Sequence, residues 1–408
     1  MINWLILVFV SLFPSEIYQT IIDEPYFAHL NSEMFVYVSA ALAMMYVGWL
    51  IAEPSSAPIT PHISVPTRPQ QPSQTVLTVL RYLTLVMPFV YLLRIWLTPE
   101  VQEALAVDMP MNEIRDLVRD MSVNYLIQVA IVTNILCFYL TKPEQKLSSL
   151  LNWLGCLITI SCLLLTMQRS LLMPYLLTIA VAYYQGHKLM SPLRALAIGA
   201  LALLLGLCLF SVIALLRQQE GLGLFQGIVG YTIASYNRLA LMLQGQLTLP
   251  DSGTGFYTLQ WLFYPPVIRE LLPIHELTST VLGLPLPELR LDNYYAQFDA
   301  IADTPLADVF IWTTFFGAVY SDYGWLSLVI YLFYGAASQM AYVYMKKGNF
   351  LAILLYCYSY ATALLWIGDG FIFQSTTLLM CYIAVLLHLA AYWRHKHTPT
   401  LTTVSSSR

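Results

Sequence analysis

Three arginines adjoin long apolar segments, where a cation is costly unless it has a partner. Arg169 lies between two apolar runs with almost no loop, Arg217 directly follows another run, and Arg238 lies two residues after Tyr236. A guanidinium is permanently charged, and its planar fork binds phosphate oxygens through two parallel hydrogen bonds. We therefore predict that Arg169, Arg217 and Arg238 bind a phosphate or pyrophosphate near a membrane surface. The alternative is that they only extend to lipid headgroups.

Other arginines allow either interpretation. Arg115 and Arg119, in the sequence EIRDLVRD, belong to a mixed-sign helical face that i,i+4 ion pairs explain without a ligand. Arg269 and Arg290 could bind the ligand or lie on a solvated surface. The candidate ligand-binding residues are Arg169, Arg217 and Arg238, together with Arg290, Tyr231 and Tyr236.

A candidate acid–base group is Asp322, which lies between two apolar segments and near Gly324, a residue that permits a bend. A carboxylate there needs a partner, such as one of the arginines, and could act as general base or orient an arginine. Equally, Asp322 could be the N-cap of the next helix. Other carboxylates that could act in the same region are Asp308, Asp292, Asp251 and Glu220.

The composition defines the elements that must hold these groups. Hydrophobic residues make up 58% of the 408 residues and charged residues only 10%, whereas soluble domains are about 25% charged. This excludes an ordinary cytosolic enzyme, a nucleic-acid-binding protein and a disulfide-rich scaffold. The composition predicts an all-α, polytopic membrane protein, because only helices and closed barrels satisfy their backbone in lipid.

Apolar runs of about 20 residues predict the spans. We expect about ten transmembrane helices, at 2–14, 33–52, 76–98, 121–141, 148–167, 171–186, 195–216, 323–344, 349–367 and 371–393. The first run is short and ends at Pro14, and it lacks the features of a cleaved signal peptide. A further apolar stretch, 305–320, is expected to be a half-helix that dips into the membrane.

The positions of the lysines predict the topology. With alternating spans and a cytoplasmic N-terminus, all six lysines lie in the cytoplasm, as the positive-inside rule requires. Both termini are then cytoplasmic. Four arginines join the lysines there, namely Arg68, Arg194, Arg394 and Arg408, and Arg81 lies near the cytoplasmic end of its helix. The eight cations left for the opposite side or the helix ends nearest to it are all arginines: Arg94, Arg115, Arg119, Arg169, Arg217, Arg238, Arg269 and Arg290.

The loops divide the chain into three parts. Residues 1–216 hold the N-terminal helices and a Pro-rich cytoplasmic linker at 54–75, and residues 305–408 hold the C-terminal helices. Between them, 217–304 form a large, partly re-entrant periplasmic loop. Apolar residues repeat at helical spacing from Leu224 to Leu243, which predicts an amphipathic helix that lies in the interface or re-enters a cavity.

Signals for metal and nucleotide chemistry are absent from the sequence. The chain has no Walker loop, no GxGxxG, no HExxH and no DxD pair in the outer loops. The six cysteines lie in apolar stretches without CxxC spacing. We therefore expect neither a metal nor a cofactor.

Three short motifs are similar to those of the Wzy-type oligosaccharide repeat-unit polymerases, which make O-antigen and related polysaccharides. They are QRSLL at 168–172, YTIASYNR at 231–238, and VFIWTTF at 309–315 followed by YSDYG at 320–324. The layout of the family extends over most of the chain, but the arginine-x10-glycine pattern of some members is missing from the outer loops.

This resemblance implies a metal-independent glycosyltransferase of the bacterial inner membrane. Its substrates would be undecaprenyl-pyrophosphate-linked oligosaccharides, and the growing glycan would move from one lipid carrier onto a second lipid-linked unit at the periplasmic face. The implied roles are pyrophosphate binding for Arg169, Arg217 and Arg238, and base or positioning chemistry for Asp322. The resemblance further implies a chain-length regulator as partner, besides membrane lipids, and no nucleic acid.

Two alternatives remain from the sequence. An O-antigen ligase uses the same donor with a lipid A core acceptor. A flippase for lipid-linked oligosaccharides is a transporter, and it should show two similar halves with cations at mid-depth. The sequence has no internal duplication, and its arginines gather on one side.

Overall fold

The computed structural model describes residues 2–53, 73–107, 124–142, 144–166, 169–186, 224–265, 274–283, 290–307, 310–365, 372 and 375–397. Within these ranges the regular secondary structure is helical and contains no strand, which confirms the all-α prediction. Of the Pro-rich linker expected at 54–75, residues 54–72 lie outside the described residues, as does the expected span at 195–216. Residues 73–75 form the start of the next helix.

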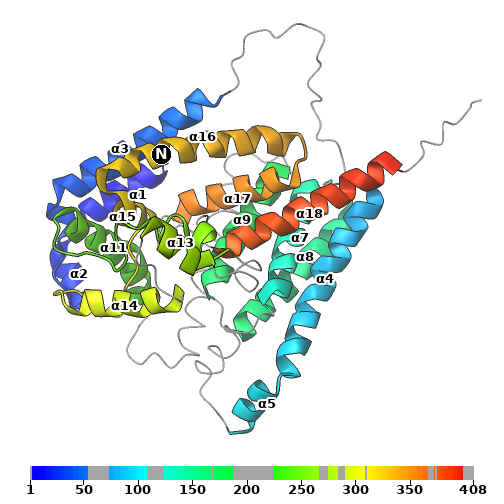
Figure 1. The fold of residues 1–408 in the computed structure, drawn as a ribbon, viewed down its shortest axis with the longest axis horizontal. Coiled ribbons are helices and arrows are strands. Elements are labelled where there is room, and N and C mark those ends of the chain that lie inside the picture. Colours follow the sequence, from blue (N-terminus) through cyan, green and yellow to red (C-terminus); the bar gives the residue numbers. More distant parts are fainter. Residues whose placement is uncertain are drawn as a thin grey trace, which may run out of the picture.

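One group of helices packs around a large apolar core (Figure 1). Its members are α4 (Gln74–Trp96), α7 (Asn124–Leu140), α8 (Lys146–Leu165), α9 (Arg169–Gly186), α17 (Phe350–Leu365) and α18 (Ser375–His397). Helix α7 contacts all five of the others, so it is the centre of this group. The short helix α5 (Pro99–Ala106) follows the end of α4.

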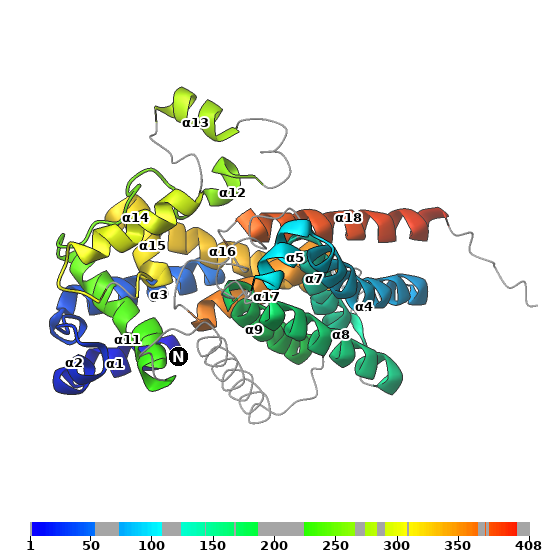
Figure 2. The ribbon, with the colours of Figure 1, turned by 90° about the horizontal axis from the view of Figure 1, so that it is seen from below.

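A second group surrounds a separate core. It contains α1 (Ile2–Ser11), α2 (Ser15–Ile22), η1 (Ala28–Leu30), α3 (Ser32–Ile51), α11 (Leu224–Leu243), α15 (Phe315–Tyr323), η3 (Gly324–Leu326) and α16 (Ser327–Lys346). Helices α3 and α16 lie against each other along much of their length, and α16 also contacts α17 of the first group (Figures 1 and 2).

Four helical segments among the described residues are long and apolar enough to cross a membrane: α3, α4, α8 and the run Phe315–Lys346. Helices α1 and α2 together form a possible fifth, bent by 91°. Shorter apolar helical stretches lie within α7, α9, α17 and α18 and occupy four of the expected spans. They are Tyr125–Leu140, Leu171–Gly186, Phe350–Ala363 and Thr376–Ala391. A helical membrane protein is therefore supported, while the count of ten spans stays a prediction.

The lysines at the C-terminal ends of α7 and α16 lie at the same end of the bundle. The hydroxyl of Tyr139, in the last turn of α7, donates to the carbonyl of Met345, in the last turn of α16, at 3.1 Å. Lys142 follows Tyr139 closely, and Lys346 and Lys347 follow Met345. This agrees with the expected clustering of lysines, and the assignment of that end to the cytoplasm stays a prediction.

A third apolar cluster lies at the opposite end, where α11 ends and α16 begins. It is built from residues 244–264 and 290–307, here called the cap, together with 310–318. The cap includes α12 (Gln260–Phe263) and α14 (Arg290–Ala302), and α13 (Ile274–Leu282) extends from it (Figure 2). Of the half-helix expected at 305–320, residues 315–320 are helical, in α15, whereas residues 310–314 are irregular, so its dipping into the membrane stays a prediction. Thr314 then caps α15 by accepting a hydrogen bond from the Gly317 amide at 3.2 Å.

Helix α11 confirms the helix expected at 224–243 but has a different environment. Every residue from Ile233 to Leu241 is buried within the protein, including polar ones such as Ser235 and Asn237. A helix buried on all sides packs into a core instead of presenting one face to lipid. The C-terminal half of α11 is therefore an internal element of the second group.

Two glycines set the close approach of α3 and α16. A Cβ atom added to Gly48 would overlap the carbonyl oxygen of Leu332, and one added to Gly335 would overlap the carbonyl oxygen of Met45. Small residues let helix backbones approach closely in membranes, where packing rather than the hydrophobic effect drives association.

We predict that Gly48→Val or Gly335→Val destabilises the protein by about 3 kcal/mol, because the backbones must separate. Thermal unfolding of the purified protein in detergent measures this effect. Gly227→Ala in α11 is the control, because nothing lies within 4 Å of its added Cβ. Equal melting temperatures for all three variants would contradict the prediction.

Candidate functional site

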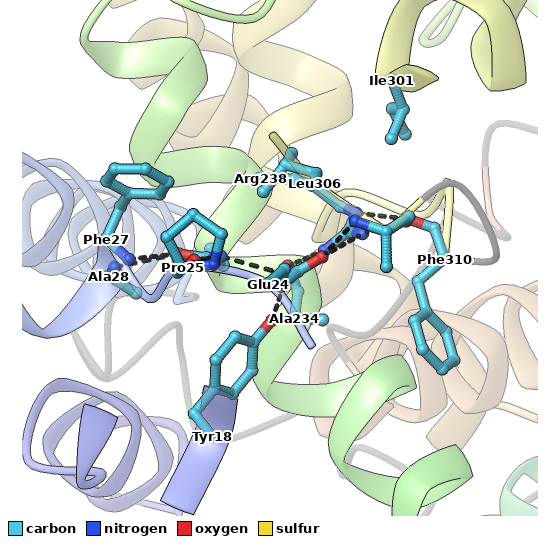
Figure 3. A network of polar contacts seen from close by, with 12 residues as sticks. Tyr18, Glu24, Pro25, Phe27, Ala28, Ala234, Arg238, Ile301, Leu306 and Phe310 are labelled. Carbon is cyan, nitrogen blue, oxygen red and sulfur yellow. Dashed lines mark hydrogen bonds and ion pairs between the residues drawn. The ribbon is translucent and has the colours of Figure 1, made fainter. Parts of the chain in front are cut away.

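Arg238 is completely buried and faces a buried carboxylate that the sequence motifs did not indicate. Its guanidinium binds Glu24 through two contacts, Nη1 to Oε1 at 3.0 Å and Nη2 to Oε2 at 3.1 Å (Figure 3). Glu24 follows Asp23, whose left-handed backbone (φ 57°) ends α2 and turns the chain. Both side chains of the ion pair are 0% exposed.

The remaining donors of Arg238 are also occupied. Nε donates to the carbonyl of Phe310, Nη1 donates to that of Ala234 at 3.0 Å, and Nη2 donates to that of Ala307 at 2.8 Å. A guanidinium has five N–H donors, so each one has an acceptor from the protein. A pyrophosphate could bind Arg238 only by displacing these acceptors.

Glu24 is equally saturated. It accepts hydrogen bonds from the hydroxyl of Tyr18, from Nδ2 of Asn237 at 3.1 Å and from the amide of Ala307 at 2.6 Å. Charge-assisted hydrogen bonds are stronger where water is absent. These bonds therefore offset part of the free-energy cost of removing the two charges from water.

Asn237 extends the same network to the chain after α2. Its Oδ1 accepts from the amides of Phe27 at 2.6 Å and Ala28 at 3.1 Å, and its Nδ2 also donates to the carbonyl of Pro25 at 2.9 Å. The Glu24–Arg238 cluster, defined as Tyr18, Glu24, Asn237 and Arg238, thus joins α2, α11 and the segment around 307–310. This geometry favours an internal, structural role for Arg238.

Asp322 forms the centre of a second cluster, between α15 and the cap. Its Oδ2 accepts from the amide of Thr258 at 2.8 Å and from the Thr258 hydroxyl at 2.7 Å, and its Oδ1 accepts from the Tyr257 amide at 3.3 Å. The side chain is only 5% exposed. Among the residues that the structure describes, its hydrogen-bond partners include no arginine.

The alternative that Asp322 caps the following helix is wrong. Asp322 lies in the last turn of α15, the N-cap position of α16 belongs to Leu326, and Gly324 makes the break between them with φ 55°. Asp322 instead orders the backbone of residues 257–258.

Other contacts hold the same segment of the cap. The Gly253 amide donates to the Ser321 carbonyl at 3.0 Å, and Oγ of Ser252 lies 2.6 Å from Oγ of Ser321. From α14, Nδ2 of Asn293 donates to Asp251 at 2.6 Å. Residues 250–258 are therefore fixed from two directions, by α15 and by α14.

The structure places the other candidate residues on different elements. Arg169 is the first residue of α9 and Arg290 is the first residue of α14, although their side chains, like that of Tyr231 in α11, lie outside the described part of the structure. Tyr236 is 2% exposed in the second core. Arg217 lies outside the described residues. Binding of pyrophosphate by Arg169 and Arg217 stays a prediction.

We predict that breaking the buried ion pair destabilises the protein more than removing it. Glu24→Gln or Arg238→Met leaves a buried group without its partner and should cost about 3–5 kcal/mol, whereas the double variant should cost less than the sum. Thermal unfolding of the four proteins measures the coupling. Glu16→Gln, at an exposed position on α2, the helix that precedes Glu24, should change little. Strictly additive effects would contradict the prediction.

We also predict that Asp322→Asn opens residues 250–258, because an amide keeps only one acceptor oxygen and its NH2 group must face either the Tyr257 amide or the donors of Thr258. The expected loss of stability is about 1–3 kcal/mol. Hydrogen exchange should become faster in this segment, and Asp299→Asn, at an exposed position on α14, is the matched control. If exchange at 250–258 stays slow in Asp322→Asn, then Asp322 does not order the segment.

Comparisons of the chain with family models, with curated proteins and with solved structures find no match. The resemblance to the Wzy-type polymerases therefore depends on the short motifs at 168–172, 231–238 and 309–324. Two of these motifs contain the residues that form the buried clusters, namely Asn237 with Arg238 and Asp322. The function has to be argued from the arrangement of the residues themselves.

Proposed function

We propose that the protein is a polysaccharide polymerase, a metal-independent glycosyltransferase of the bacterial inner membrane. It transfers a growing glycan from undecaprenyl pyrophosphate to a lipid-linked repeat unit at the periplasmic face. Both termini lie in the cytoplasm, and a chain-length regulator is the proposed protein partner. The proposal builds on the similarity of motifs described above.

The observation that supports this proposal most directly is the position of Arg169 at the first residue of α9. The first amides of a helix have no intrahelical partners, and the helix dipole is positive there. A guanidinium at such a position adds a permanent charge to a site that already favours phosphate. Helix α8 ends at Leu165, so the connection before Arg169 is very short.

The cap provides a second line of support. It has an apolar cluster of its own and is fixed to the bundle through Asp322, so the substrate end of the protein is ordered around residues 250–258. An enzyme that joins two membrane-attached substrates needs a rigid frame, because productive geometry tolerates only small displacements.

In the proposed reaction, the bond between the anomeric carbon of the donor sugar and the pyrophosphate oxygen breaks. A bond forms between that carbon and an acceptor hydroxyl oxygen, and the hydroxyl proton passes to a base. Arg169 would stabilise the negative charge that develops on the departing pyrophosphate. Asp322 acts in this scheme as a positioning residue, because both of its oxygens already accept hydrogen bonds from residues 257–258.

A ligase and a flippase are the competing functions, and a deletion strain separates them. Loss of a polymerase leaves a single repeat unit on the lipid A core, loss of a ligase leaves the core without antigen, and loss of a flippase stops transfer of units across the membrane. Gel analysis of cell-surface polysaccharide distinguishes the first two results.

We predict that Arg169→Lys fails to restore long polymer in that strain although the protein still accumulates in the membrane. Lysine keeps the charge but does not have the planar fork, so it cannot bind phosphate in the bidentate manner. The expected decrease in long-chain polymer is at least about tenfold, the effect of removing one charge-assisted hydrogen bond from a transition state. Full activity of Arg169→Lys would indicate simple charge anchoring.

The matched control is Arg94→Lys. Arg94 lies in the last turn of α4 and is exposed. The predicted topology places it at the same end of the bundle as Arg169. A side chain that only extends to headgroups tolerates this exchange, so Arg94→Lys should keep normal polymer.

A further inference from the structure

Helices α12 and α13 expose apolar side chains outside the main bundle. In α12, Trp261 is 39% and Leu262 is 45% exposed, and in α13, Leu277 is 63% and Val281 is 70% exposed. Figure 2 shows α13 projecting away from the rest of the cap. Helices α12 and α13 contact each other, so these four exposed apolar groups lie on two neighbouring short helices.

The arrangement of residues in α13 is amphipathic. Leu277 and Val281 are four residues apart and Ile274 is three residues before Leu277, so the three share one helix face. Glu276 and Ser279 lie on the opposite side of the helix. A short helix with this division between faces is suited to lie along a boundary between water and lipid.

Helix α12 lies next to α18, one of the apolar helices of the bundle. Helix α12 contacts α18, beside its N-terminal end (Figure 2). On α18 itself, Leu386 is 66% and Leu389 is 56% exposed, as expected for an apolar helix surrounded by lipid. That end of α18 is opposite to the end that bears Lys396, so the two short helices lie near the other surface of the membrane.

The inner side of α12 fixes it to the cap. Phe263 is 1% exposed and belongs to the apolar cluster of the cap, and Gln260 is 5% exposed. Trp261 and Leu262 are therefore held outward by a buried neighbour on each side. Their exposure is set by the packing of α12.

We propose that α12 and α13 form an interfacial arm, in which Trp261, Leu262, Leu277 and Val281 insert into the lipid leaflet at the end of the bundle opposite the lysines. The partner of this surface is the acyl-chain boundary of the membrane that the chain itself spans. The proposal is independent of the transfer reaction proposed above.

The charges of α13 predict which property of the lipid drives its insertion. The sequence of α13, IHELTSTVL, contains Glu276 and no lysine or arginine. Attraction to anionic headgroups requires clustered cations, so insertion of α13 depends on apolar area. It should therefore be the same in neutral and in anionic membranes.

The test uses the full chain in proteoliposomes, labelled at one introduced cysteine with an environment-sensitive fluorophore after replacement of the native cysteines. Leu277→Cys and Val281→Cys report the apolar face, and Glu276→Cys is the control on the polar face of the same helix. Quenching by brominated phosphatidylcholine measures contact with acyl chains, and quenching by iodide measures contact with water.

Lipid quenching should be roughly threefold stronger at 277 and 281 than at 276, and iodide quenching should show the reverse order. Both ratios should persist when anionic phosphatidylglycerol is added to the vesicles. Equal iodide quenching at 276 and 277 would mean that the arm lies in water. Protection of 277 from both quenchers would mean that protein covers it, and a requirement for phosphatidylglycerol would mean that charge drives the contact. Each of these three results overturns the proposal.

Discussion

The buried ion pair between Glu24 and Arg238 is the constraint on which the second helix group depends. Its members are 214 positions apart in the sequence, and neither charge is tolerable in a dry core without complete hydrogen bonding. The carbonyls of Phe310 and Ala307 and the amide of Ala307 supply part of that bonding. The ends of three distant segments must therefore come together for either charge to be buried.

This cluster shows that an arginine in an apolar sequence can be part of the internal structure and need not bind a ligand. The free-energy cost of burying a cation can be offset by a bound anion or by a carboxylate of the protein. The sequence around Arg238 does not distinguish these two possibilities. Glu24 precedes Pro25 in a short loop without a recognised motif, so no local spacing connects it with α11. The available signal in the sequence was a carboxylate just after an apolar segment. Only the fold shows that this carboxylate is buried and which residue is its partner.

The sequence predicts the helices of the fold better than it predicts the contacts among them. Long apolar runs predict eight of the helices, because burial in lipid requires a helical backbone. They are α3, α4, α7, α8, α9, α16, α17 and α18. Helix α11 shows the limit, since apolar residues at helical spacing predict the helix, whereas its polar residues Ser235 and Asn237 are buried as well. The environment of a helix depends on its neighbours. For the same reason, the partner of Asp322 in the cap, Thr258, has no signal in the sequence.

The two clusters also restrict the chemistry that the protein can perform. A general base has to accept a proton from substrate, and a carboxylate surrounded by protein donors has no free position from which to do so. Glu24 is in this condition, whereas Asp322 accepts hydrogen bonds from the Tyr257 amide and from the amide and hydroxyl of Thr258. Their buried charges define the frame, since each fixes a segment that would otherwise leave the bundle. The same frame holds the base of α12, so that its apolar side chains remain directed outward.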